Sequence, residues 1–368
     1  MNPRYKKIYC CTPVAFAANE HFFIRDTGLI SRTLQSMGIE SKCIMPLPYH
    51  DSDQREGIIR TEYKNLRSVS WWKSLGIDAV ILYSWGAPKY TLIARAIHKA
   101  GLKLVIHMDF GGNLKPSKNA SWLKIIKSPF VNIFRSLHLS YADVITTSPV
   151  AAESFRSHIL YGEKIASKVF NMPAPVSTNF HLLPNIEKEI KVVCVGRWSD
   201  DKGDQVKRPL FMINVAKEII ERDSMVQVEI YGKIGDKVKE RYEKLSQNIK
   251  NRIHLMGYAL NHTLPEIYNK AQVAICTSRS ESTHIASAEA MCCGCSLVVP
   301  PRPTLKILHW YTTQNSGSIA AEDTPESMAM AVITELQMWR EGKRCAEHIA
   351  NCWQPIFHVN QAIKQIFK

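Results

Sequence analysis

Short apolar runs alternate with amphipathic stretches along both halves of the chain. The short runs predict buried strands, and the helical spacing of apolar residues at 28–36 and 92–99 predicts helices between them. Strands that alternate with helices predict parallel sheets covered by helices on both faces, which is an α/β fold. The predicted strands are 7–11, 41–45, 79–83, 104–108, 144–147 and 168–171 in the first half, and 191–196, 228–232, 273–276 and 296–300 in the second.

A proline-rich stretch interrupts this rhythm at 171–184 and predicts a linker between two domains. The chain has 368 residues, which is longer than one typical hydrophobic core can use. The chain length and the proline-rich stretch therefore both predict two domains.

Two glutamates stand eight residues apart in the second half, Glu281 in a predicted turn and Glu289 in the predicted helix 285–293. Eight positions turn an ideal helix through roughly 800 degrees, so Glu289 is expected near the azimuth of the helix start. The backbone N–H groups at this start form an anion site suited to phosphate. The alternative is an ordinary amphipathic helix with two solvated glutamates. The amides expected to bind the anion are those of Ser282, Thr283, His284 and Ile285.

A second set of residues suited to anions lies upstream. The run 191–196 predicts a strand that ends in Gly196 and Arg197, and the following loop carries Lys202 and Lys207 ahead of a predicted helix. A strand, a turn with fixed positive charge and a helix start form an anion cradle. A solvated charged loop is the alternative, which fits any one of these residues but less easily the ordered set.

Together the two motifs resemble the nucleotide-sugar site of family 4 retaining glycosyltransferases of the GT-B fold, of the bacterial cell-surface glycan type. The resemblance rests on E-x7-E followed by Ala-Met-x-Cys-Gly and an apolar strand, and on Gly-Arg followed by a lysine. It implies a GT-B architecture, in which two Rossmann-like domains have parallel sheets facing a central cleft. The implied parts are an acceptor-side domain (1–175), a nucleotide-sugar-binding domain (176–348) and a C-terminal helix that crosses back to the first domain (349–368).

The resemblance also implies roles for the motif residues. Glu281 would contact the transferred sugar and Glu289 the nucleotide ribose, while Arg197 and a lysine would neutralise the departing diphosphate. Counting back from the predicted helix favours Lys207 as that lysine, and counting forward from Arg197 leaves Lys202 as the second candidate. The implied chemistry needs no covalent nucleophile, metal ion or cofactor, because the nucleoside-diphosphate sugar is the donor substrate.

The first half carries weaker chemical signals. His107 comes at the end of the predicted strand 104–108, where the carboxyl end of a parallel strand faces a ligand, so we expect it to contact the sugar. A histidine packed in the interior is the alternative. Asp51 and Asp53 form a D-x-D pattern, but they follow a polar loop and not an apolar strand, so a solvated loop is expected there.

The formal net charge of +14 requires an anionic partner or surface. The segment 115–140 mixes lysines and an arginine with aromatic and aliphatic residues, which suits an anionic bilayer surface. A core helix with solvated lysines is the alternative. No nucleic-acid-binding signature occurs, and no run is long enough for a membrane span. The basic residues of this segment are Lys115, Lys118, Lys124, Lys127 and Arg135.

These observations predict a retaining, metal-independent glycosyltransferase that acts on a glycan or lipid-linked glycan acceptor of the lipopolysaccharide, O-antigen or capsule type. The start of the chain is too short and too charged for a secretory signal, so we expect a cytoplasmic protein, peripheral on the inner face of the cytoplasmic membrane. Two alternatives use the same site: a sugar-nucleotide 2-epimerase, and a non-catalytic nucleotide-sugar-binding subunit.

Overall fold

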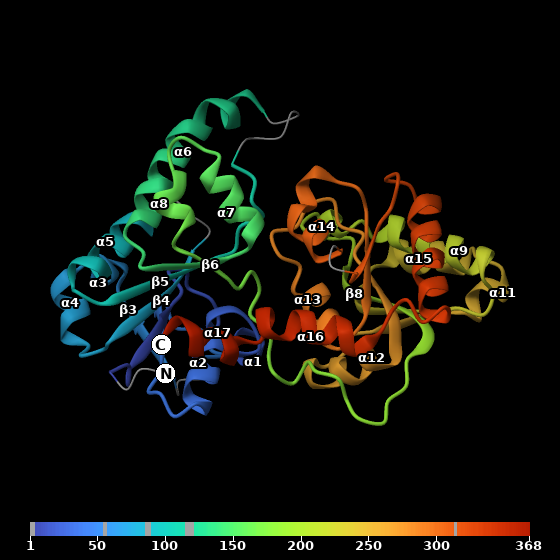
Figure 1. Ribbon diagram of the computed structural model, residues 1–368, viewed down its shortest axis with the longest axis horizontal. Helices are drawn as coiled ribbons and strands as arrows, with labels where there is room; N and C mark the ends of the chain where they lie inside the picture. Colours follow the sequence, from blue (N-terminus) through green and yellow to red (C-terminus); the bar gives the residue numbers. More distant parts are fainter. Residues whose placement is uncertain (1–3, 54–56, 85–89, 115–120, 313–314) are drawn as a thin grey trace. The chain divides into compact units, whose positions relative to one another are not determined.

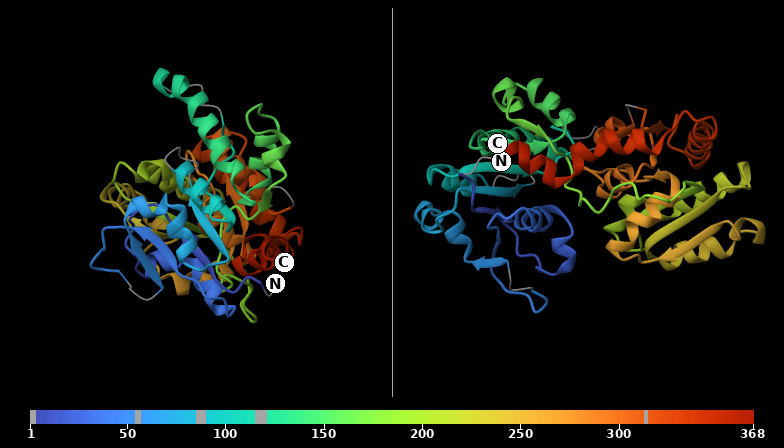
Figure 2. Two further views of the ribbon diagram at one scale, coloured as in Figure 1. Left: turned by 90° about the vertical axis from the view of Figure 1, so that its left-hand side faces the viewer. Right: turned by 60° about the horizontal axis from the view of Figure 1, so that its bottom comes forward.

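The structure is a computed structural model that describes residues 4–53, 57–84, 90–114, 121–312 and 315–368. The chain divides into two compact units: unit 1 comprises Met1–Ser177 with Ile356–Lys368, and unit 2 comprises Thr178–Pro355. Each unit contains one sheet with helices packed on both faces (Figure 1 and Figure 2). Every strand pairing within the two sheets is parallel, which confirms the predicted α/β class.

Unit 1 has a 7-stranded sheet in the order β3-β2-β1-β4-β5-β6-β7. Its strands are β1 (Ile8–Cys11), β2 (Cys43–Pro46), β3 (Ile58–Thr61), β4 (Ala79–Ser84), β5 (Lys103–Met108), β6 (Val144–Thr147) and β7 (Val169–Asn171). Its helices are α1 (Glu20–Phe23), α2 (Asp26–Ser36), α3 (Tyr63–Leu66), α4 (Val69–Ser74), α5 (Thr91–Lys99), α6 (Trp122–Ser140), α7 (Pro149–Arg156), α8 (Gly162–Ala166) and α17 (Val359–Ile366).

The central strands of unit 1 are buried on both faces. Along β4, Val80 and Leu82 join one hydrophobic cluster, whereas Ala79 and Ile81 join another. The two-residue period of a strand sends alternate side chains to opposite faces in this way. Residues of α4, α5 and α7 complete the first cluster, and residues of α1, α2 and α17 complete the second. Burial on both faces explains why these strands appear in the sequence as continuous apolar runs.

Unit 2 has a 6-stranded sheet in the order β10-β9-β8-β11-β12-β13. Helices α9 and α15 pack on one face, where Val192 and Cys194 of β8 are buried, and α12 and α13 contact the strands β8 and β11. The strands are β8 (Glu189–Trp198), β9 (Gln227–Ile234), β10 (Ile253–Gly257), β11 (Ala271–Ile275), β12 (Ser296–Val299) and β13 (Gly317–Ile319). The helices are α9 (Pro209–Arg222), α10 (Asp236–Glu243), α11 (Gln247–Lys250), α12 (Leu264–Lys270), α13 (Ile285–Cys292), α14 (Lys306–Thr312), α15 (Pro325–Arg340) and α16 (Ala346–Phe357), with 3-10 turns η2 (Asp204–Lys207), η3 (Asn261–Thr263) and η4 (Pro303–Leu305).

The end of the chain returns to unit 1. Helix α17 contacts α2, and Val359, Ile363 and Phe367 are buried in the second cluster of that unit. The preceding helix α16 still packs on unit 2, where the indole N–H of Trp353 donates to Ser316 Oγ at 2.7 Å. The units therefore divide at 177/178 and 355/356, whereas the sequence suggested 175/176 and 348/349.

The edge strands β3, β10 and β13 are absent from the strands predicted from the sequence. An edge strand pairs on one side only and needs no continuous apolar run, and β3 even carries Arg60 at a buried position. Arg60 Nη2 lies 2.7 Å from Asp53 Oδ1, and neither side chain is more than 2% exposed. Burial alone would raise the pKa of Asp53, but hydrogen bonds from Arg60, Ala18 and His50 lower it to about 2. The expected solvated loop is wrong for Asp53, which closes a buried ion pair.

The ten cysteines of the chain are free thiols. Eight of them are buried, Cys352 is half-buried and Cys345 is exposed. Cys292, Cys293 and Cys295 are completely buried where α13 ends and β12 begins, as small side chains at a helix-to-strand junction should be. Burial raises the pKa of all three thiols, which keeps them protonated and unreactive.

Candidate functional site

The candidate site lies at the carboxyl ends of β8 and β11 in unit 2, which is where open parallel sheets bind ligands. β8 ends with Gly196, Arg197 and Trp198. A Cβ atom at Gly232, whose φ is +125°, would lie 1.7 Å from the carbonyl oxygen of Gly196, so only glycine fits there. The two strands consequently approach closely below the loop that carries Arg197. The Arg197 side chain is 67% exposed, and its Nε lies 3.1 Å from Asp204 Oδ1.

The loop after β8 brings Lys207 to Glu281. Lys207 ends the turn η2, just before α9, and its Nζ lies 2.6 Å from Glu281 Oε1. The backbone holds this approach, because Thr277 Oγ1 donates to the Lys207 carbonyl at 2.8 Å and the Arg279 amide donates to the Val206 carbonyl at 2.8 Å. Burial alone would raise the pKa of Glu281, but the electrostatic interaction with His284, followed by the charge and hydrogen bond of Lys207, outweighs it and holds the pKa below its usual value.

Lys202 occupies a different position in the same loop. It is exposed, whereas the side chains of Lys207 and Glu281 are only 16% and 13% exposed. Of the two lysines that the sequence left as candidates, the structure brings Lys207 to the glutamate of the E-x7-E motif.

The start of α13 presents unused backbone donors. His284 precedes the helix in the left-handed conformation, with a φ of +51°, and its Nδ1 lies 2.6 Å from Ser287 Oγ. Burial lowers the pKa of His284 to about 4, so the imidazole is neutral at neutral pH. Within the described residues, the amides of Ser282, Thr283, His284 and Ile285 have no hydrogen-bond acceptor. These are the four amides that the sequence predicted for an anion.

Glu289 lies inside α13 and is 8% exposed. In the part of the chain that the structure describes, its carboxyl group makes no hydrogen bond and no ion pair. Burial raises its pKa to about 8, so the group is largely protonated at neutral pH. A buried carboxyl without a protein partner is costly, and hydrogen bonds to a ligand would offset that cost.

Cys276, Glu281 and His284 hold their ligating atoms within 4.8 Å of one another. The group does not suit a divalent cation, because the ammonium of Lys207 already lies on the Glu281 carboxylate. Burial also raises the pKa of Cys276 to about 11, so its sulfur stays protonated. The positive charge next to the Glu281 carboxylate is therefore the ammonium group of Lys207.

An arginine pair beside Lys207 was missed in the sequence. Arg208, in the left-handed conformation at the start of α9, pairs with Asp323, and Arg302 Nη2 lies 2.5 Å from the other oxygen of that carboxylate. Arg208 also lies over the ring of Phe211, at 3.3 Å from its centroid. One aspartate thus holds two arginines from loops 94 positions apart along the chain. The adjacency of Arg208 to Lys207 was the only available signal.

In unit 1, His107 does not occupy the position expected of a ligand contact. Its side chain is 1% exposed, and its Nδ1 lies 2.8 Å from Thr146 Oγ1 on the neighbouring strand. Burial lowers its pKa to about 4. The structure therefore favours the alternative of a packed histidine, and the predicted sugar contact finds no support.

A different group of unit 1 gathers at the carboxyl ends of β4 and β5. The Tyr83 hydroxyl lies 3.4 Å from Asp109 Oδ2, and Asp26 begins α2 with a φ of +48°. Burial raises the pKa of Asp26 to about 6, the Arg25 charge opposes this, and the charge of Asp109 adds to it. No sequence pattern joins these residues, because they come from three separate segments.

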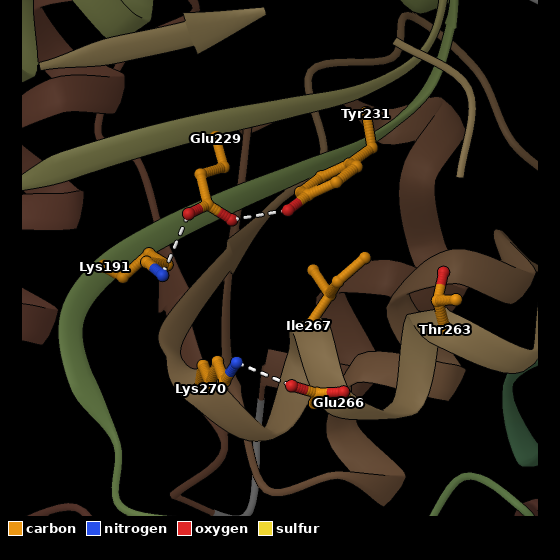
Figure 3. A pocket seen from close by; sticks show the side chains of 7 residues that line it. All are labelled: Lys191, Glu229, Tyr231, Thr263, Glu266, Ile267 and Lys270. Atoms are coloured by element: carbon orange, nitrogen blue, oxygen red, sulfur yellow. Dashed lines mark hydrogen bonds and ion pairs between the residues drawn. The ribbon is translucent and has the colours of Figure 1, made fainter. Parts of the chain in front are cut away.

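A cavity of about 190 Å³ lies elsewhere in unit 2 (Figure 3). Its polar groups satisfy one another: Lys191 lies 2.9 Å from Glu229, and the Tyr231 hydroxyl donates to Glu229 at 2.7 Å. Lys191 precedes Arg197 by six positions, or roughly 20 Å of strand, whereas Tyr231 pairs with Val195, two positions before Arg197. The cavity is smaller than most ligand pockets. It is lined by Lys191, Glu229, Tyr231, Thr263, Glu266, Ile267 and Lys270.

Each of the two units has a parallel sheet, and GT-B structures resemble the chain over nearly its whole length, which confirms the expected two-domain α/β fold of the GT-B class. Residues 189–338 match the family model described as Glycosyl transferases group 1. The family match and the fold together support a nucleotide-sugar glycosyltransferase. No curated protein matches the chain by sequence.

Solved structures resemble the chain over nearly its whole length. Sucrose-phosphate synthase from Thermosynechococcus elongatus is 14% identical with a TM-score of 0.62, covering 98% of each chain. HepE from Anabaena, in complex with UDP and glucose, is 14% identical with a TM-score of 0.64, covering 99% of this chain and 98% of its own. The lipopolysaccharide outer core galactosyltransferase WaaB is 15% identical with a TM-score of 0.63, covering 98% of this chain and 99% of its own. At these identities the likeness concerns the fold.

Proposed function

We propose that the chain is a retaining glycosyltransferase that moves a sugar from a nucleoside diphosphate to a hydroxyl of a cell-surface glycan. The observation that carries this proposal is the contact between Lys207 and Glu281 beside the unused amides of the α13 start. A fixed cation, a carboxylate and free N–H donors together suit a ligand that has both phosphate and sugar hydroxyl groups.

Each group of the site has a place in this proposal. The amides of 282–285, Lys207 and the exposed Arg197 bind the diphosphate. Glu281 accepts hydrogen bonds from hydroxyls of the transferred sugar. Glu289 binds the ribose hydroxyls, which would give its buried carboxyl the partners that it lacks in the described residues.

The proposed reaction breaks the bond between the anomeric carbon and the diphosphate oxygen, and forms a bond from that carbon to the acceptor oxygen on the same face. The acceptor proton passes to the departing phosphate oxygen, so no covalent enzyme intermediate forms. Negative charge develops on the leaving diphosphate, where preorganised cations and amides lower the barrier. A fixed lysine and arginine take the place of a metal ion in this scheme.

The acceptor we propose is a glycan or lipid-linked glycan of the lipopolysaccharide, O-antigen or capsule type. Unit 1 would bind this acceptor and unit 2 the donor. WaaB, whose fold is similar, is described as a lipopolysaccharide outer core galactosyltransferase, which supports this acceptor class. The expected place of the reaction is the cytoplasm, at the inner face of the cytoplasmic membrane.

A panel of nucleotide sugars and nucleoside diphosphates, screened by thermal shift, tests the proposal first. A ligand at 100 times its dissociation constant stabilises the native state by about 2.7 kcal/mol. The best donor is then incubated with candidate acceptors, and the anomeric configuration of the product is determined. Conversion of the donor to an altered free nucleotide sugar would identify an epimerase. Donor binding without any turnover would identify a non-catalytic subunit.

A further inference from the structure

Helix α6 exposes a row of large apolar side chains along most of its length. Trp122 is 67% exposed and Phe130 is 63% exposed. In Figure 1 and Figure 2 the amino-terminal part of α6 stands away from the rest of unit 1. We call this row the α6 apolar face; its residues are Trp122, Leu123, Ile126, Phe130, Ile133, Phe134 and Leu137, each between 44% and 67% exposed.

The residues of the α6 apolar face share one side of the helix. At about 100 degrees per residue they fall within an arc of roughly 120 degrees, a width typical of an amphipathic helix, and Ile125, 52% exposed, lies outside this arc. An amphipathic helix of a water-soluble unit normally turns such an arc toward the core, but here it faces outward. Ile159, at 97% exposed, extends the apolar surface, because Ser136 Oγ donates to the carbonyl of the adjacent Leu160.

Polar contacts in the carboxyl-terminal half of α6 fix the helix to unit 1. Asn132 is 5% exposed, donates to the Leu114 carbonyl at 3.1 Å and accepts from the Tyr161 hydroxyl at 2.8 Å. His138 is buried, and its Nε2 lies 2.8 Å from Ser84 Oγ. These contacts set the rotation of the helix, so the α6 apolar face cannot turn inward without breaking buried hydrogen bonds.

The charged residues of the segment 110–142, which contains α6, are entirely basic, although Glu163 lies on the neighbouring helix α8. No Asp or Glu occurs between Asp109 and Asp143. Lys127 is exposed next to the apolar arc, whereas Arg135 lies 5.1 Å from the ring centroid of Phe110 and so faces the unit. Lys115 and Lys118 lie outside the described residues, and the side chain of Lys124 is not described either. Of the five basic residues that the sequence singled out, Lys127 is the one that the described structure places beside the apolar face.

We propose that the α6 apolar face inserts into the surface of an anionic lipid bilayer, with α6 lying in the plane of the interface. The chain as a whole carries a net charge of +14, which attracts anionic headgroups and opposes the pairing of two copies through α6. Within the described residues, no helix has the length and hydropathy of a membrane span, which agrees with interfacial binding. The 19 residues of α6 extend about 28 Å, enough to bring several apolar side chains below the headgroups at once.

Vesicle cosedimentation tests this inference without any nucleotide sugar, so its outcome is independent of the proposed reaction. The full chain is mixed with vesicles of equal parts phosphatidylcholine and phosphatidylglycerol, and with phosphatidylcholine alone. We expect binding to the anionic vesicles that falls as salt rises. The double variant Trp122→Ser, Phe130→Ser should bind about tenfold or more weakly, because two inserted rings are lost. Lys127→Gln should bind severalfold more weakly.

Matched controls change exposed side chains of unit 2, whereas α6 belongs to unit 1. Met330→Ser removes an exposed apolar side chain of α15, and Lys244→Gln removes an exposed lysine next to α10; both should bind as the parent does. Thermal unfolding of each variant verifies the fold. Equal vesicle binding by the parent and the double variant would overturn the proposal. So would a parent that is a dimer in solution, becomes monomeric in the double variant and binds no vesicles, since a second copy would then cover α6.

Discussion

The ammonium nitrogen of Lys207 lies 2.6 Å from a carboxylate oxygen of Glu281, although 74 positions separate the two residues in the chain. Both side chains are largely buried, so neither charge has much water to stabilise it alone. The pair joins the loop after β8 to the loop after β11. A ligand that binds at the amino-terminal end of α13 therefore contacts a lysine and a glutamate whose relative position is already fixed.

Replacing Lys207 with alanine should lower the transfer turnover about 10²- to 10³-fold, the range found when a single donor to a developing oxyanion is lost. The variant also leaves the Glu281 charge without its partner next to the anionic diphosphate. Steady-state kinetics with the best donor measures the effect. Lys202→Ala is the matched control, because this exposed lysine of the same loop should stay within a few-fold of the parent. If Lys202→Ala loses most of its activity and Lys207→Ala is nearly normal, the diphosphate contact is Lys202 and not Lys207.

Substitutions of the two glutamates of the E-x7-E motif should affect different functions, nucleotide binding for one and sugar transfer for the other. Glu289→Ala should weaken binding of the nucleoside diphosphate itself by about tenfold, since one or two hydrogen bonds to the ribose are lost. Glu281→Ala should leave binding of the nucleoside diphosphate nearly intact, because the substitution frees Lys207 for the phosphate. The same substitution should depress sugar transfer, because the contact with the sugar hydroxyls is lost. Calorimetric titration with the nucleoside diphosphate, followed by transfer assays, separates the two effects. Equal losses from both substitutions would refute the division of roles.

The raised pKa of Glu289 predicts how folding stability depends on pH. The folded carboxyl has a pKa of about 8, whereas in the unfolded chain it has the ordinary glutamate pKa of 4.5. Between these values the unfolded chain binds fewer protons, so rising pH destabilises the fold through this group. Glu289→Gln removes the titration. Its stability relative to the parent should increase by roughly 1.4 kcal/mol per pH unit across that window. Urea unfolding of ligand-free protein at a series of pH values measures the difference, and a difference that does not change with pH would contradict the prediction.

Transfer should continue when divalent metal ions are removed. Lys207, Arg197 and the α13 amides supply positive potential where the diphosphate is proposed to bind, and the protonated thiol of Cys276 makes a poor metal ligand. Initial rates with and without excess chelator should agree within about twofold. Loss of activity that magnesium or manganese restores would show that the lysine and the arginine do not suffice.

The layered fold was predictable because burial on both faces leaves continuous apolar runs, such as those around Val80 and Val192, that local sequence reveals. The family resemblance favoured Lys207 over Lys202 by its spacing from the predicted helix, and the role of Lys207 at a diphosphate stays a prediction. Its contact with Glu281 could not be predicted, because only the tertiary fold joins the two loops. The same limit applies to Asp26 beside Asp109 and to Arg208 with Arg302 on Asp323. His107 shows the opposite case: its place on the strand was predicted, but burial of its side chain depends on neighbours that the local sequence does not name.

The distribution of the thiols gives this protein a built-in reporter of its own unfolding. In the folded chain a maleimide can reach the exposed Cys345 and, more slowly, the half-buried Cys352, while the other eight thiols are shielded. Unfolding makes all ten reactive, so the mass added in a brief labelling pulse counts the unfolded molecules directly. Because Cys10, Cys11 and Cys43 belong to unit 1 and Cys194 and Cys276 to unit 2, peptide mapping of the label would reveal which unit opens first.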